Sequence, residues 1–397
     1  MMDAALQLLL TPRRRRIRLI SPGAPGVLGS GAAFSRPSPA TYTGQDGVSV
    51  LPVAPEMPRF QGLAGFLPME GATINFTADS DGLPVPVGTN TVEFSGEAPA
   101  KFVGRQVVKH VRGADTADTN CGAWATIRGG SYNTTFTYYR WVYVQADSTA
   151  TAITFGLEHP SGGLWGAAMR PVAADMARRN VWQRLAITVT TASSGSSPSN
   201  PGLVLRMAGP AGSYCYSQAT QFELGAIPSS YVPTAGAPAN RAMEVLNCVI
   251  PAAQRRGTVV GRILIPADVP ASAYLGLFCL DSGGNTNRSY IAKEVGGNTI
   301  VFGRAGTGGG QFNMATIQPG VPFGYAIGWD VETGAVRASI AGSPVQGFTG
   351  TTAANRFLPG NGHPGLNSPA WSEYGAHDLY PGVLLPDPRL QALALAA

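Results

Sequence analysis

Short runs of β-favouring residues, separated by Gly- and Pro-rich breaks, recur through most of the chain. The clearest run is TFTYYRWVYVQA at residues 135–146, where both alternating sets of side chains favour strands. Breaks such as HPSGG, SSGSSPSNPG and AGPAGS carry turn residues. With 51 Gly and 32 Pro in 397 residues, such breaks are frequent. Many short strands at this spacing predict β-sandwiches and disfavour a helical bundle.

Further strand-like runs fall into two groups, each large enough for one sandwich. They are Thr151–Leu157, Trp182–Thr190, Leu203–Met207 and Tyr214–Leu224, then Thr258–Ile265, Tyr274–Leu280, Thr299–Arg304, Pro322–Trp329 and Ala335–Ile340. The phrase DVETG predicts a hairpin loop before Val336. Apolar side chains within these runs are expected to be buried. They include Val142, Val144, Trp182, Ile187, Val189, Phe222, Ile263, Ile265, Phe278, Ile327 and Trp329.

The breaks predict four parts of the chain. These are a basic N-terminal anchor at 1–33, an extended Pro/Gly-rich connecting region at 34–100, a first sandwich at 101–240 and a second at 241–397. The second is expected to end in a short helix over PDPRLQALALAA. There Asp387 is a candidate cap, Pro388 suits the first turn, and Leu390, Leu393 and Ala394 share one side.

Basic charge is concentrated near the N-terminus. The chain has 28 basic and 23 acidic residues, and Arg13, Arg14, Arg15, Arg16 and Arg18 supply most of the excess. A nucleic-acid-binding protein would spread basic residues over a folded face, because each neutralised phosphate adds affinity. We therefore expect no nucleic-acid binding.

The residues before these arginines are apolar, with Leu6, Leu9 and Leu10 at helical spacing. A helix this short is marginal alone in water, which predicts that it lies against another surface. The alternative is that the arginines are a solvated run. The apolar stretch is shorter than the roughly 20 residues of a membrane span, and its charge order differs from that of a signal peptide. We expect cytoplasmic synthesis without membrane insertion.

Sequence signals for catalysis, cofactors and metals are weak. There is no G-x-S-x-G motif, and the glycine-rich Gly303–Gly310 lacks the Lys-Ser/Thr of a phosphate loop. The histidines and cysteines are scattered, which favours buried, reduced cysteines over a zinc site. Glu158, Glu223, Asp330 and Glu332 could supply a glycosidase pair, but 23 acids make that coincidence unsurprising. We expect no enzymatic activity, cofactor or metal.

Sugar binding requires only exposed aromatic faces beside hydrogen-bonding side chains. The candidates are Tyr132 with Asn133 in a GGSYN loop, Trp165 in GGLWG, and Trp371 with His363 in a late loop. The alternative is that these rings pack on a neighbouring subunit.

Several longer phrases carry a family resemblance. They are FSRPSPATYTGQDG (34–47), MPRF (57–60), LPMEGATINF (67–76), NVWQRLAITVT (180–190), QFELGAIPSSYVPTAGAPANRA (221–242) and HDLYPGVLLPDPRLQALA (377–394). Together they resemble tail-fibre, spike and head-fibre proteins of tailed bacteriophages. In that family the order Thr-Asn is uninterrupted, whereas here Ile74 separates Thr73 from Asn75.

The resemblance implies a mostly β fold with two concanavalin-like jelly-roll sandwiches in tandem. It implies a virion structural protein, usually an oligomer and often a trimer, assembled in the host bacterial cytoplasm. The expected partners are capsid, neck or tail proteins, contacted through the leucines and arginines of the N-terminus, and a host-surface glycan. Two alternatives stay open: an architectural head-decoration, neck or tail-tip component, and a capsular polysaccharide depolymerase.

Overall fold

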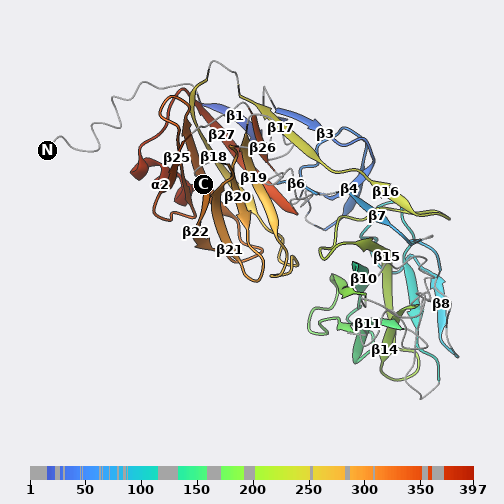
Figure 1. The fold of residues 1–397 in the computed structure, drawn as a ribbon. Helices are drawn as coiled ribbons and strands as arrows, with labels where there is room; N and C mark the ends of the chain where they lie inside the picture. The colour runs from blue at the N-terminus through green and yellow to red at the C-terminus, as the bar shows by residue number, and fades with distance from the viewer. Residues whose placement is uncertain are drawn as a thin grey trace. The chain divides into compact units, whose positions relative to one another are not determined.

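The computed structural model describes residues 16–22, 27–29, 32–44, 46, 48–61, 64, 66–70, 72–77, 80–83, 86, 88–114, 133–158, 171–191, 202–250, 254–281, 287–306, 309–350, 356–359 and 371–397. These residues form short strands through most of the chain, and helix α2 lies near the C-terminus (Figure 1). The chain divides into two compact units. The first comprises Met1–Pro37, Glu56–Gly71 and Met243–Ala397, and the second comprises Ser38–Pro55 and Ala72–Ala242.

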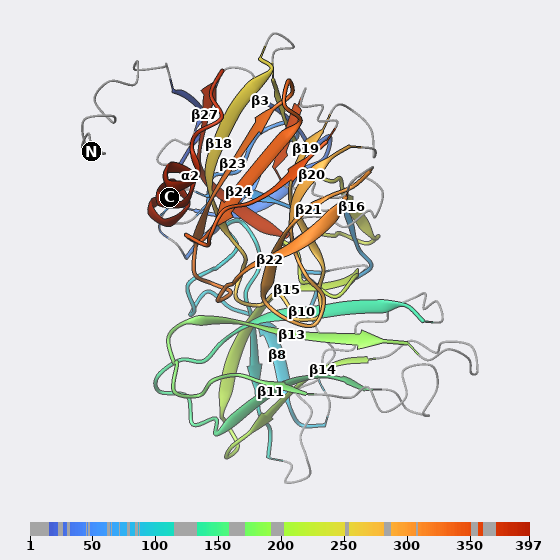
Figure 2. The same ribbon diagram turned by 60° about the vertical axis from the view of Figure 1, so that its left-hand side comes forward.

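The first unit is a sandwich of two antiparallel sheets, whose strands form two layers (Figure 2). One sheet has the order β2-β1-β27-β18-β23-β24-β25, with β6 also pairing with β27. Its strands are β1 (Ile17–Ser21), β2 (Val27–Leu28), β6 (Leu67–Met69), β18 (Arg256–Leu264), β23 (Phe323–Asp330), β24 (Ala335–Ile340), β25 (Gln346–Thr349) and β27 (Ser372–Pro381).

The other sheet of this unit has the order β22-β21-β20-β19-β26-β17-β3. Its strands are β3 (Ala32–Ser35), β17 (Val245–Val249), β19 (Leu275–Asp281), β20 (Ser289–Lys293), β21 (Thr299–Arg304), β22 (Gly310–Thr316) and β26 (Arg356–Pro359). Rings from the two sheets meet between the layers. Phe278 of β19 and Tyr325 of β23 have centroids 5.3 Å apart, and those of Phe302 in β21 and Phe348 in β25 are 5.1 Å apart.

Helix α2 (Asp387–Ala396) covers part of the first sheet of this unit. Its Leu390 and Ala394 are buried in a cluster with Val260 of β18 and Ala326 of β23, and Leu393 packs against the same cluster. The predicted apolar side of the helix is therefore confirmed. Burial against α2 on one face and the sandwich core on the other explains why β23 is buried along its whole length.

The predicted cap of α2 is wrong. Pro386 occupies the cap position and Asp387 is the first helical residue, with no side-chain cap hydrogen bond. Its carboxylate instead binds Arg337 of β24, whose Nη1 lies 2.8 Å from each of the two oxygens. The Asp387 side chain thus pairs with a strand of the neighbouring sheet instead of capping the helix.

The second unit is built around a five-stranded sheet, β13-β10-β15-β9-β8, and a three-stranded sheet, β12-β11-β14. The strands are β8 (Thr91–Phe94), β9 (Val108–Val111), β10 (Thr135–Tyr143), β11 (Ala152–Glu158), β12 (Val172–Ala173), β13 (Trp182–Thr190), β14 (Gly202–Ala208) and β15 (Tyr214–Leu224). Two short pairs complete it. They are β4 (Ala40–Thr43) with β5 (Val50–Val53), and β7 (Thr73–Asn75) with β16 (Ala239–Arg241).

One hydrophobic core fills the space between the five-stranded and three-stranded sheets. Tyr138 of β10 and Phe222 of β15 stack with ring centroids 4.1 Å apart. Ile153 and Phe155 of β11 join the same cluster from the other sheet. Alternate residues of β10 therefore point into this core, and the intervening ones point to the opposite face.

The predicted fold class is confirmed: strands dominate, sandwiches form, and a short helix ends the chain. Every side chain predicted to be buried is buried. The predicted DVETG hairpin joins β23 to β24. Of the four cysteines, Cys215, Cys248 and Cys279 are buried and reduced as expected, and Cys121 lies outside the described residues.

The segment 34–100, expected to be one connecting region, forms strands of only three or four residues, including β4, β5, β6 and β7. It is divided between the two units, because Glu56–Gly71 belongs to the first and residues on both sides of it belong to the second. The expected change of sandwich near residue 240 lies close to the change of unit between Ala242 and Met243.

Candidate functional site

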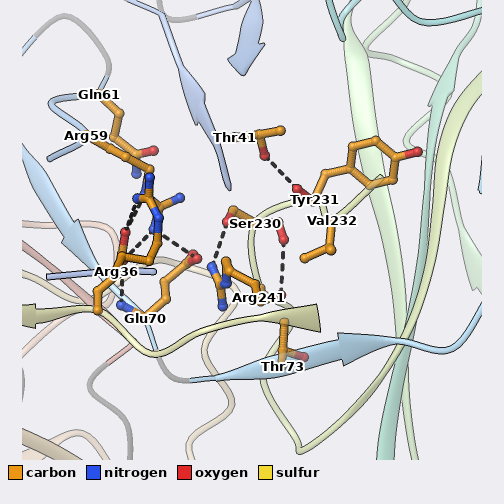
Figure 3. Close-up of polar contacts among 12 residues, drawn as sticks. Arg36, Thr41, Arg59, Gln61, Glu70, Thr73, Ser230, Tyr231, Val232 and Arg241 are labelled. Carbon is orange, nitrogen blue, oxygen red and sulfur yellow. Dashed lines mark hydrogen bonds and ion pairs between the residues drawn. The ribbon is translucent and has the colours of Figure 1, made fainter. Parts of the chain in front are cut away.

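Three charged residues of the phrases described above, Arg36, Arg59 and Glu70, form a buried ion network with Glu244 in the first unit. Glu244 Oε1 lies 2.9 Å from Arg36 Nη1 and 2.7 Å from Arg59 Nε, and its Oε2 lies 2.6 Å from Arg59 Nη2. Glu70 accepts a further hydrogen bond from Arg59 at 3.1 Å; Figure 3 draws Arg36, Arg59 and Glu70 together. The side chains of Arg36, Arg59 and Glu244 are completely buried.

Burial lowers the pKa of Arg36, and pairing with Glu244 opposes that effect. Two buried arginines without acidic partners would be strongly destabilising, so the network acts as a unit. It joins three segments that are far apart in the sequence of the first unit. Its role is therefore structural, and Glu70, with a side chain 15% exposed, is the one member of the network that reaches solvent.

Polar residues of the same phrases form a second network, within the second unit. Glu223 accepts hydrogen bonds from the Ser229 amide and the Thr73 hydroxyl, both at 2.6 Å. The Asn75 side chain donates to the Val232 carbonyl at 2.7 Å. Thr73 and Asn75 thus both make buried contacts despite the extra Ile74. Figure 3 also shows Thr41 donating to the carbonyl of Tyr231, at 2.8 Å.

The residues predicted to bind sugar are not brought together by the described structure. Tyr132, Trp165 and His363 lie outside the described residues. Asn133 is exposed just before β10, with φ 49°. Trp371 is only 8% exposed, which corrects the expectation that its ring face is open to a sugar. Trp371 immediately precedes β27, and its side chain is withdrawn from solvent there.

The structure also describes only part of the predicted N-terminal anchor. Leu6, Leu9, Leu10, Arg13, Arg14 and Arg15 lie outside the described residues. Arg16 and Arg18 both pair with Asp378 of β27, with Nε to Oδ1 distances of 3.3 and 2.6 Å. Arg18 belongs to β1, which pairs with β27. These two arginines therefore bind the sandwich of their own chain, and the candidate anchor shortens to residues 1–15.

One face of the five-stranded sheet carries an aromatic ladder. Cross-strand pairing places Trp182 of β13 beside Tyr143 of β10, Tyr143 beside Tyr216 of β15, and Tyr216 beside Lys109 of β9. Tyr214 precedes Tyr216 by two residues and so points to the same face. We call Trp182, Tyr143, Tyr216, Tyr214 and Lys109 the aromatic face.

The rings of the aromatic face are in mutual contact. Ring centroids lie 5.4 Å apart for Tyr143 and Trp182, 6.2 Å for Tyr143 and Tyr216, and 5.7 Å for Tyr214 and Tyr216. The Lys109 ammonium lies 5.2 Å from the Tyr214 centroid, within the range of a cation–π contact. Tyr143, Trp182 and Tyr216 are buried, whereas Tyr214 is half-buried and reaches solvent.

Hydrogen-bonding groups surround the open end of this face. Lys109 Nζ lies 2.5 Å from Glu97 Oε2, and the Tyr216 hydroxyl lies 2.7 Å from the same oxygen. The Tyr214 hydroxyl donates to Asp147. The Glu97 side chain is 60% exposed and Asp147 is also exposed, so both carboxylates can accept further hydrogen bonds from solvent or a ligand.

The protonation states of these groups follow from their contacts. Hydrogen bonds from Lys109 and Tyr216 lower the pKa of Glu97. Burial, together with the hydrogen bond to Asp147, raises the pKa of Tyr214 to about 12. At neutral pH the site therefore presents an ionised Glu97 carboxylate and a neutral Tyr214 phenol. Such a site can accept hydrogen bonds from several hydroxyl groups while an aromatic ring contacts an apolar face.

Sequence reasoning placed Tyr143 and Tyr214–Leu224 on strands but did not select these tyrosines. The available signal was the repetition of aromatic residues at every second position in both strands. Their neighbours Glu97 and Lys109 could not be identified, because they come from a segment whose path the sequence did not reveal.

Several solved structures resemble this chain at low similarity. The CBM40 of the Ruminococcus gnavus IT-sialidase, bound to α2,3 sialyllactose, is 15% identical with a TM-score of 0.27 and covers 35% of this chain and 82% of that one. The tandem CBM22 domain of Paenibacillus barcinonensis Xyn10C is 11% identical with a TM-score of 0.28, covering 79% and 97%. Mouse laminin α1 domains LG4-5 are 10% identical with a TM-score of 0.23, covering 76% and 100%.

These TM-scores are too low to support an inference about function. No protein-family model matches the chain. No curated protein matches it either.

Within the described residues, no group of three or more His, Cys, Asp or Glu side chains could hold a metal ion. The helical residues described do not form a helix long and apolar enough to cross a membrane.

Proposed function

We propose that this protein is a non-enzymatic structural protein of a phage virion that attaches to glycans of the host surface, and that the aromatic face is the attachment site. One observation carries the glycan assignment: the solvent-reaching Tyr214 ring lies beside the exposed carboxylates of Glu97 and Asp147. A sugar ring has an apolar C–H face suited to an aromatic ring and hydroxyl groups that donate to carboxylates. The virion assignment is supported by the phrases described above.

The site suits binding without catalysis. Glu223 and Asp330, which the sequence offered as catalytic carboxylates, are engaged in internal hydrogen bonds with Ser229 and Arg256. A single small sugar contact gives low affinity. Several copies of the chain in one oligomer would raise the effective concentration of each site, so weak individual contacts suffice for attachment.

A glycan array probed with the purified full-length chain tests this function. We expect the wild-type protein to bind a subset of bacterial surface glycans. Tyr214→Ala removes the ring that reaches solvent, and Asp147→Asn weakens the acceptor beside it. Each substitution should reduce the signal at least tenfold, which corresponds to about 1.4 kcal/mol.

The matched control is Tyr290→Ala. Tyr290 is a half-buried tyrosine on β20 in the other unit, and it also lies near a cation, because the Arg288 guanidinium is 5.9 Å from its ring centroid. This variant should bind like the wild type. A wild-type protein that binds no glycan would contradict glycan attachment and favour a purely architectural role. Equal losses in the Tyr214 and Tyr290 variants would contradict the assignment of the site.

A further inference from the structure

A pocket of about 320 Å³ lies in the first unit where β18, β23 and β27 meet. It is lined by Gln254, Arg255, Arg256, Glu332, Pro381 and Gly382. Two backbone hydrogen bonds fix its walls: the Val331 amide donates to the Arg255 carbonyl and the Gly382 amide donates to the Arg256 carbonyl, each at 2.8 Å. The volume is near the lower end of the range of roughly 300–1,000 Å³ for small-molecule sites.

Arg256 is held firmly by carboxylates. Its Nε lies 2.9 Å from Asp330 Oδ2, and its Nη2 lies 2.7 Å from Glu332 Oε2. Asp330 is its cross-strand partner and also accepts a hydrogen bond from the Glu332 amide at 2.9 Å. These contacts balance the charge of Arg256 and fix Glu332 at the side of the pocket.

Arg255 and Gln254 retain binding capacity. Arg255 Nε lies 3.6 Å from Glu332 Oε1, too far for a hydrogen bond, and its side chain is 59% exposed. The Gln254 Oε1 atom is buried and accepts no hydrogen bond from any residue that the structure describes. A buried acceptor without a hydrogen bond is unfavourable, so a donor supplied by a ligand would be stabilising.

We propose that this pocket binds an acidic sugar residue, with the sugar carboxylate on the guanidinium of Arg255 and a ring hydroxyl donating to Gln254 Oε1. The planar fork of a guanidinium matches the geometry of a carboxylate. Glu332 can accept a second hydroxyl. Because Asp330 and Glu332 offset the two arginines, a single sugar binds weakly, and the site requires both the acid and the hydroxyls. It lies in a different unit from the aromatic face, and it differs from that face in requiring an acidic sugar.

The test is a titration of the full-length chain with methyl β-D-glucuronide, followed by amide chemical shifts in NMR spectra. Methyl β-D-glucoside is the neutral control, and N-acetyl-aspartate supplies a carboxylate without a sugar. We expect the glucuronide to shift the resonances of residues 254–257 and 332, with an affinity at least tenfold higher than that of either control. Arg255→Gln should weaken glucuronide binding at least tenfold.

Two further variants show whether glucuronide binding depends on this pocket or on another basic or aromatic surface. Arg389→Gln removes an exposed arginine on α2 and should leave glucuronide binding unchanged. Tyr214→Ala should leave the glucuronide-induced shifts of residues 254–257 and 332 unchanged, even where it weakens glycan binding at the aromatic face. The proposal is overturned if the glucoside binds as well as the glucuronide, if N-acetyl-aspartate matches it, if Arg255→Gln has no effect, or if either Arg389→Gln or Tyr214→Ala abolishes the shifts of residues 254–257 and 332.

Discussion

At the scale of single residues, Glu244 shows how a polar position becomes structural. Its two oxygens satisfy two buried arginines that come from distant parts of the sequence. In contrast, Glu332 pairs with Arg256 at the surface, where its side chain is 51% exposed. Solvent screens the Glu332–Arg256 pair but does not reach the Glu244 pairs. Ion pairs of similar length therefore contribute differently to the free energy of unfolding.

Glu244→Gln should therefore lower the free energy of unfolding by about 3–5 kcal/mol, because Arg36 and Arg59 keep their charges in a buried site. Glu332→Gln, the matched surface change, should cost less than about 1 kcal/mol. Urea-induced unfolding measures both. Equal losses of unfolding free energy in the two variants would show that the buried network contributes no more to stability than the surface pair.

His377 makes the stability depend on pH. Burial lowers its pKa to about 4, although a hydrogen bond with the Gly375 carbonyl acts in the opposite direction. The unfolded chain accepts this proton near pH 6.5, whereas the folded chain accepts it only near pH 4. The unfolded state therefore binds more protons between these values, and stability falls as the pH decreases through that window.

His377→Phe keeps a ring between Tyr325 and Tyr374, whose centroids lie 5.5 and 5.6 Å from the imidazole. At pH 4.5 the wild type should have lost about 2–3 kcal/mol through this group relative to pH 7, and the variant should lack that loss. His110 is also buried with a lowered pKa and contributes equally in both proteins. Parallel pH profiles would contradict the assignment to His377.

At the scale of elements, the sequence was most informative where a run of β-favouring residues is bounded by turn residues. The bounds of β13, β15, β21 and β24 match the prediction, because both signals are local. The aromatic face was missed because it depends on which strands are neighbours: Lys109 reaches Tyr216 only through the pairing of β9 with β15. Local patterns do not contain that information.

The residues of the phrases illustrate the same limit. Nothing in the local sequence indicates burial of Arg36, Arg59 and Glu70, yet they lie around one buried carboxylate. Likewise, Trp371 follows a Gly- and Pro-containing stretch that suggested a loop, but it lies directly before β27 and is buried. In each case a contact between distant segments decided the outcome.

At the scale of the whole molecule, a proposed N-terminal anchor precedes sandwiches that are proposed to bind glycans. Strand β1 begins at Ile17 and pairs with β27. Removal of residues 1–20 would therefore delete most of this strand from the sheet. A deletion of residues 1–15 leaves that strand intact. We expect this variant to fold and to bind glycans like the full chain but to be missing from assembled particles, as measured by its presence in purified virions. Normal incorporation would contradict the anchor.

The central claim, that the aromatic face is a glycan-binding site, is tested most directly by locating a bound oligosaccharide. The measurement is an NMR titration of the full-length chain with the strongest ligand from the array. The largest amide shifts are predicted to fall at residues 97, 109, 145–147 and 214–216. Shifts concentrated elsewhere, with these residues unaffected, would contradict it.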